Sequence, residues 1–232
     1  MKGRVNESLN EICYLSDEIC SELLASIRNE ITCIFKVSEA FATIDMLTSL
    51  ATLSLNYKYV RPVFGEETEI RDAVHPLLTM KNKANNEVIQ NDVFLTEKKN
   101  ILFFTGPNMS GKTTYLKMVG ILHIMAQMGC FVPCSFAKIR LCDQIFTRMA
   151  NNDDLENNIS TFTMEMTEMS YMMQNMTDKS LLLIDELGRG TSTRDGMSIC
   201  YSFLEFLTHK KVFTLFSTHY HDLCFLANFR EN

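Results

Sequence analysis

The 232-residue sequence predicts an α/β protein with a mixed or parallel sheet, preceded by a helical segment. Residues 1–56 contain no proline and only one glycine, Gly3, which favours long helices. From Tyr57 onward, short apolar runs alternate with helical segments, the pattern of βαβ units. A glycine-rich loop joins one of these runs to a helix. We therefore expect a helical domain over 1–56 and an α/β domain over 57–232.

The helical segment divides into two predicted helices. Apolar residues recur at helical spacing in the second one, at Val37, Ala40, Phe41, Ile44, Leu47 and Ala51. The preceding stretch, 7–34, is expected to form the first helix, with a break near Thr32. Two helices that follow each other in this way predict a hairpin.

The α/β segment contains five apolar runs expected to form strands, near 60–64, 101–105, 138–149, 180–184 and 212–216. Helices are expected near 111–128, 160–176, 194–209 and 219–227. This alternation predicts a sheet with helices packed on it.

The stretch TGPNMSGKTT, 105–114, has the spacing of a phosphate-binding loop. It follows the apolar run 101–104 and opens a helix at Gly111. Gly106 and Gly111 allow the backbone to approach an anion closely, and the free N–H groups of the helix start point toward it. Lys112 would supply a positive charge for the β- and γ-phosphates of a nucleotide, and the Thr113 hydroxyl is a candidate Mg²⁺ ligand.

Two further strand ends carry candidate catalytic groups. Asp185 and Glu186 follow the run SLLLI, so Asp185 is expected to hold Mg²⁺ and Glu186 to orient or deprotonate the attacking water. His219 follows the run 212–216 and is a candidate sensor of the γ-phosphate. The alternative for Asp185, Glu186 and His219 is that they are ordinary polar side chains exposed to solvent at the ends of strands.

Composition excludes several classes of protein. The net charge of −6 argues against a self-sufficient basic nucleic-acid binder. No apolar run has the length of a membrane span, and the N-terminal stretch lacks the apolar core of a signal peptide. The eight cysteines form no CxxC pair, so we do not expect a zinc site. We expect the cysteines to be small buried apolar side chains of a protein in a reducing compartment.

Three segments together, TGPNMSGKTTYLK, LLLIDELGRGTSTRDG and FSTHYHDL, resemble the ATPase domain of the MutS family of DNA mismatch-recognition and recombination proteins. The resemblance extends from about Val37 to Leu223. It implies an ABC-type P-loop ATPase attached to a helical lever, of which residues 1–56 would be the end. The stretch NISTF, in place of an LSGGQ-like signature, argues against a transporter or chromosome-organising ATPase.

The resemblance also implies further site residues. Ser160 matches the serine that reaches the γ-phosphate of a dimer partner, although a simple helix N-cap is the alternative. Val88 and Ile89 lie where the family packs side chains on adenine. The expected phosphate contacts are Gly106, Pro107, Asn108, Met109, Ser110, Gly111, Lys112, Thr113 and Thr114.

Short stretches such as IFTR, 145–148, resemble the meiotic branch of the family, and within it the fourth eukaryotic homologue, a crossover-promoting subunit that pairs with the fifth. The resemblance therefore implies a nuclear ATPase that uses ATP and Mg²⁺ and acts on double-stranded DNA or recombination intermediates as a heterodimer. A mismatch-repair role and a truncated module that binds nucleotide without hydrolysing it are the alternatives. Family members continue beyond both ends of this chain, so we expect a fragment of a longer product or a truncated relative.

Overall fold

The computed structural model divides the chain into two compact units, Met1–Thr52 and Leu53–Asn232. It describes residues 2–81, 88–107, 109–149 and 161–228.

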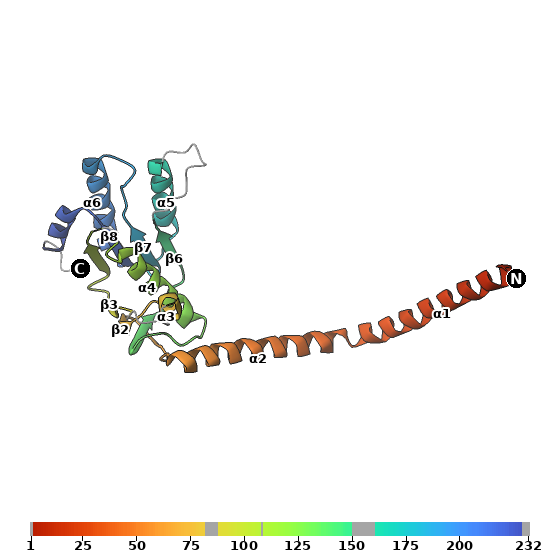
Figure 1. Ribbon diagram of the computed structural model, residues 1–232. Coiled ribbons are helices and arrows are strands. Elements are labelled where there is room, and N and C mark those ends of the chain that lie inside the picture. The colour runs from red at the N-terminus through yellow and green to blue at the C-terminus, as the bar shows by residue number, and fades with distance from the viewer. Residues whose placement is uncertain (1, 82–87, 108, 150–160, 229–232) are drawn as a thin grey trace. The chain divides into compact units, whose positions relative to one another are not determined.

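The first unit is helical. Helix α1 spans Lys2–Asn29, and helix α2 begins at Ile31 and ends at Tyr57, inside the second unit (Figure 1). The break lies at Glu30, close to the predicted position. The carbonyl of Glu30 accepts hydrogen bonds from the N–H groups of both Cys33 and Ile34, so the helix resumes at once.

The predicted hairpin is wrong. One residue is too short a connection for two antiparallel helices, which need a loop of about two to five residues. All residues in the stretch 3–49 are exposed, so the apolar side chains of α1 and α2 do not cover one another. Cys13, Cys20 and Cys33 are exposed as well, which corrects the expectation that the cysteines are buried; Cys130 and Cys200 do lie in the core. Among the described residues, no helix combines the length and the apolar character needed to cross a bilayer.

The second unit contains two four-stranded sheets. The first has the order β1-β5-β2-β3 and is mixed, since β1 pairs with β5 in parallel and the other two pairings are antiparallel. Its strands are β1 Val63–Gly65, β2 Thr68–Ala73, β3 Asn91–Leu95 and β5 Phe136–Arg140. The short helix α3, Pro76–Lys81, follows β2.

The second sheet is entirely parallel, with the order β4-β8-β7-β6. Its strands are β4 Ile101–Thr105, β6 Ile145–Arg148, β7 Leu181–Asp185 and β8 Phe213–Thr218. Thr105 pairs with Thr218 and Asp185 pairs with Ser217, so the carboxyl ends of β4, β7 and β8 meet at one edge.

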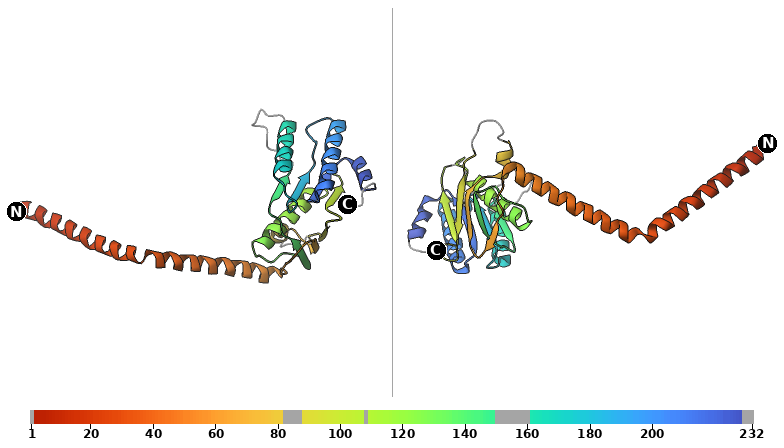
Figure 2. Two further views of the ribbon diagram at one scale, coloured as in Figure 1. Left: turned by 180° about the vertical axis from the view of Figure 1, so that it is seen from behind. Right: turned by 90° about the horizontal axis from the view of Figure 1, so that it is seen from below.

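Helices cover both faces of the parallel sheet. Helix α4, Lys112–Gln127, packs Leu116, Val119 and Leu122 into a core shared with both sheets. Helices α5, Thr161–Asn175, and α6, Thr193–Lys210, stand side by side over the other face (Figures 1 and 2). All five residues of β7 are buried, as expected for a strand covered on both sides. A 3₁₀-helix, His221–Asn228, follows β8.

The α/β prediction with a mixed or parallel sheet is confirmed, and the differences from it have local causes. The run 138–149 forms two strands in different sheets, β5 and β6, because the chain turns between Arg140 and Ile145. The expected strand near 60–64 is displaced: Val60 makes only an isolated bridge to Val132, and β1 starts at Val63. Strands β2 and β3 were not predicted, since charged residues interrupt their apolar pattern, and the six residues of α3 are too few to show a helical period.

Candidate nucleotide site

The predicted phosphate loop connects β4 to α4 at the carboxyl edge of the parallel sheet. Its backbone takes the left-handed conformation at Met109, with φ 61°, and at Gly111, with φ 99°. Gly111 is the N-cap of α4 and provides no side chain to cap the helix. The N–H groups of the first helical turn have no acceptor within a helix, so this end of α4 can receive an anion.

Lys112 is buried and lies against its own loop. Its Nζ donates to the carbonyl oxygens of Gly106, at 2.7 Å, and of Pro107, at 2.9 Å. The same nitrogen is 3.6 Å from Oε1 of Glu186. The lysine thus connects the phosphate loop with the end of β7 and holds a positive charge at the site.

Asp185 is buried and is held by hydroxyl groups from two other elements. Thr113 on α4 donates to Oδ2, at 2.5 Å, and Ser217 on β8 donates to Oδ1. A hydroxyl and a carboxylate are the hard oxygen ligands that Mg²⁺ takes, usually with substrate phosphates and waters. Among the described residues there is no group of three or more His, Cys, Asp or Glu that could hold a metal ion without such added ligands. Thr113 and Asp185 therefore fit the Mg²⁺ site that the sequence predicts.

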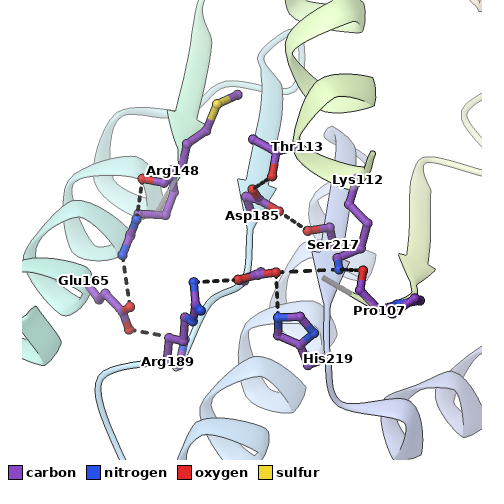
Figure 3. Close-up of polar contacts among 12 residues, drawn as sticks. Pro107, Lys112, Thr113, Arg148, Glu165, Asp185, Arg189, Ser217 and His219 are labelled. Atoms are coloured by element: carbon purple, nitrogen blue, oxygen red, sulfur yellow. Dashed lines mark hydrogen bonds and ion pairs between the residues drawn. The ribbon is translucent and has the colours of Figure 1, made fainter. Parts of the chain in front are cut away.

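Glu186 is the centre of an ionic cluster, and its partners Lys112, Arg189 and His219 are labelled in Figure 3. One carboxylate oxygen lies near Lys112 and 2.6 Å from Nε2 of His219, and the other is 2.9 Å from Nη1 of Arg189. Glu186 has a φ of 50°, which is unusual for a residue with a side chain. Lys112 and Arg189 bring two cationic groups to this edge of the sheet, balanced by the carboxylates of Asp185 and Glu186, and cationic groups are the partners that a phosphate ligand takes.

A cavity of about 340 Å³ adjoins the loop on the side of β3 and α3. It contains both residues expected near adenine, Val88 and Ile89, together with Ser110, Gly111 and Thr114 of the loop. Its other lining residues are His75, Leu78, Asn91, Tyr115 and Met118. Burial lowers the pKa of His75 and raises that of Tyr115, so both stay neutral at pH 7.

Most of the predicted site residues come together at this edge of the sheet. Asn108 and Ser160 lie outside the residues that the structure describes. Sequence reasoning did not single out Arg189, Ser217 or His221, whose Nδ1 lies 3.2 Å from the Thr105 hydroxyl. The signal for Ser217 and His221 was their position beside His219 at the end of β8, and the signal for Arg189 was its place in the family segment LLLIDELGRGTSTRDG.

A comparison with protein families matches residues 102–232 to MutS domain V. This chain belongs to the MutS family. MutS domain V is a P-loop ATPase domain, so the family and fold resemblances drawn from the motifs are confirmed.

Curated relatives extend the likeness over nearly the whole chain. MutS protein homolog 4 of Homo sapiens is 45% identical over 97% of this chain and 24% of that protein. The DNA mismatch repair protein MSH4 of Arabidopsis thaliana is 39% identical over 98% of this chain and 29% of its own length. The DNA mismatch repair protein MutS of Bacillus subtilis is 40% identical over 96% of this chain and 26% of its own length. The chain spans about a quarter of each of these relatives, and the predicted resemblance to the fourth eukaryotic homologue is confirmed.

Proposed function

We propose that residues 57–232 bind and hydrolyse ATP with Mg²⁺, at a composite site formed with a second MutS homologue. The convergence of Lys112, the Thr113–Asp185 pair and Glu186 on one phosphate loop carries this proposal. Membership in the MutS domain V family supports it.

Each residue has a distinct proposed role. Lys112 leaves its loop carbonyls to neutralise the β- and γ-phosphates, while the amides between Gly106 and Thr113 bind the remaining oxygens. Glu186 orients the attacking water and accepts its proton. His219 donates a hydrogen bond to the γ-phosphate. A Mg²⁺ ion held by Thr113 and Asp185 would offset the charge that develops on the phosphate oxygens.

The complete protein would use this ATPase in meiotic recombination. We propose that residues 1–56 form the end of a helical lever, and that ATP-dependent movement of the lever changes the grip of a heterodimer on DNA in the nucleus. The names of the human and Arabidopsis relatives support this assignment.

Mismatch repair is the second candidate function, because the B. subtilis relative named as a mismatch repair protein is 40% identical. DNA preference separates the two roles. We expect the complete protein, assembled with its partner subunit, to bind a four-way DNA junction more tightly than a duplex with one mismatch. Tighter binding of the mismatched duplex would favour repair. Absence of ATP hydrolysis by both the wild-type protein and Glu186→Ala would favour a nucleotide-binding module without catalytic activity.

A further inference from the structure

The turn that follows β7, residues 186–189, carries Glu186 and Arg189 and is held by groups from outside it. Glu186 and Gly188 both have positive φ angles, 50° and 83°. A residue with a side chain costs about 1–2 kcal/mol in this conformation, so the turn depends on its surroundings to keep it. The N–H of Glu186 donates to the carbonyl of Ser217 at 3.0 Å.

Gly188 is fixed from two sides. Its N–H donates to Oε2 of Glu165 on α5, at 3.2 Å, and its carbonyl accepts a hydrogen bond from the hydroxyl of Tyr220, at 2.9 Å. Gly196 on α6 packs so closely that a Cβ there would lie 2.6 Å from the Gly188 carbonyl oxygen. Tyr220 directly follows His219, so one glycine connects α5, α6 and the sensor histidine.

Glu165 is a buried carboxylate whose two oxygens have different partners. Oε1 lies 3.0 Å from Nη2 of Arg148 (Figure 3), and Oε2 accepts from the N–H of Gly188. The side chain of Glu165 is only 4% exposed and that of Arg148 only 11%. A buried charge needs hydrogen-bond or ion-pair partners, and here the backbone of the turn provides the partner of Oε2. The Arg148–Glu165 pair therefore joins β6 to α5 and also holds the turn 186–189 through Gly188.

We propose that Glu165, held by Arg148, is a positioning residue that sets the catalytic conformation of residues 186–189 through the amide of Gly188. The proposal rests on the hydrolytic role proposed above for Glu186. Loss of the acceptor leaves the Gly188 N–H buried without a partner, and the turn relaxes with Glu186 and Arg189 on it. ATP binding, which depends on the phosphate loop, is retained.

Glu168 provides a matched control. Its Oε2 lies 2.8 Å from Nε of the same arginine, but the side chain is 46% exposed, and the hydrogen bonds and ion pairs of the described residues do not join it to residues 186–189. Glu168→Ala therefore removes an ion pair of Arg148 without removing the acceptor of Gly188.

The test variant is the double substitution R148M/E165L in the full-length protein with its partner subunit. Replacing both members of a buried ion pair by apolar residues of similar size usually preserves stability, so the variant is expected to fold. We expect hydrogen exchange of the Gly188 amide to become at least about tenfold faster. Single-turnover hydrolysis should slow by about 30- to 100-fold, because a small displacement of a catalytic group has such an effect. Affinity for a fluorescent ATP analogue should stay within about threefold of the wild-type value, because the phosphate loop is unchanged. This limit lies well below the tenfold change that about 1.4 kcal/mol produces.

Three outcomes overturn the proposal: unchanged Gly188 exchange in R148M/E165L, unchanged turnover, or an equal loss in Glu168→Ala. If the wild-type protein does not hydrolyse ATP, the proposed function fails, and the exchange of Gly188 still decides whether Glu165 holds the turn. Loss of cooperative folding in R148M/E165L would contradict the positioning role of Glu165, because it would mean that the Arg148–Glu165 pair only stabilises the fold.

Discussion

The two units of this chain differ in how they use apolar residues. The unit Leu53–Asn232 covers its own, and buries Leu116, Leu183 and Phe216 completely or nearly so. In the unit Met1–Thr52, Leu23, Ile27 and Phe41 remain 41–69% exposed. Helices in proteins gain most of their stability from the packing of an apolar face. The second unit therefore covers its apolar residues with its own elements, whereas the helices of the first unit do not cover one another.

The polar residues show the same contrast. The second unit buries Lys112, Glu165 and Asp185, and each has a hydrogen bond or ion pair in the core around the parallel sheet. In the first unit, residues 3–49 are all exposed. Among the described residues, the buried charged side chains thus lie in the second unit.

The largest expected effect is on catalysis in the second unit. Glu186→Gln keeps the size of the side chain but removes the base, so we expect ATP hydrolysis to fall by about 10²–10⁴-fold. Nucleotide binding should remain, and the helix content should not change in circular dichroism. The exposed Glu97 provides the control, since Glu97→Gln should hydrolyse ATP like the wild type. Equal turnover in Glu186→Gln and wild type would remove Glu186 from the mechanism.

A pair of leucine truncations tests the contrast between the units directly. Leu183 is 1% exposed in β7 and Leu23 is 61% exposed in α1. In this 232-residue chain, Leu183→Ala should lower the free energy of unfolding by about 2–5 kcal/mol, and Leu23→Ala by at most about 0.5 kcal/mol. Urea denaturation measures both. A comparable loss from Leu23→Ala would mean that Leu23 is buried in the folded protein.

Two helical glycines should respond with opposite signs. A Cβ on Gly196 would overlap with Tyr220 and Gly188, so Gly196→Ala should destabilise the protein by about 1–3 kcal/mol. A Cβ on Gly3 would meet nothing within 4 Å, so Gly3→Ala should favour α1 by about 0.5–1 kcal/mol. Thermal unfolding of the second unit reports the first change, and circular dichroism of α1 the second. A neutral Gly196→Ala would show that the contact around Gly188 is loose.

The smallest effect is a pH dependence of the core. His123 is 1% exposed, and burial lowers its pKa below the usual 6.5. At pH above 6.5 the imidazole is neutral in both the folded and the unfolded state. Below that pH the unfolded chain takes up the proton first, so the stability falls by about 1 kcal/mol per pH unit until the folded-state pKa is reached. Denaturation at pH 7 and pH 5.5 should show a smaller slope in His123→Gln, while the exposed His209→Gln should keep the wild-type slope.

The parts that the sequence predicts best have strong local signals. The loop 105–114 and the ends of β7 and β8 follow apolar runs, and parallel strands must bring such ends together, so their proximity could be predicted. Strands β2 and β3 could not, because charged residues such as Glu69, Arg71 and Asp92 interrupt their patterns. The hairpin prediction failed since the apolar pattern of α1 and α2 shows that both helices need a partner, but not which one.

The contacts of single side chains could not be predicted from the sequence, and the reason is a different one. The link from Glu165 to Gly188 joins residues 23 positions apart, and it depends on a left-handed turn and on the close approach of α6 at Gly196. Such contacts follow from packing and not from local pattern. The residues expected near the nucleotide came from the motif, while those that hold the motif in place came from the structure.

The central claim is that the loop 105–114 of the second unit binds ATP through Lys112, and titration with a fluorescent ATP analogue tests it most directly. Lys117, exposed on the same helix, provides the matched control. We predict saturable binding by the wild type and by Lys117→Ala, and an affinity at least about 30-fold lower in Lys112→Ala, because a charge-assisted contact with phosphate is lost. Equal binding by Lys112→Ala and the wild type, or no saturable binding by either, would contradict it.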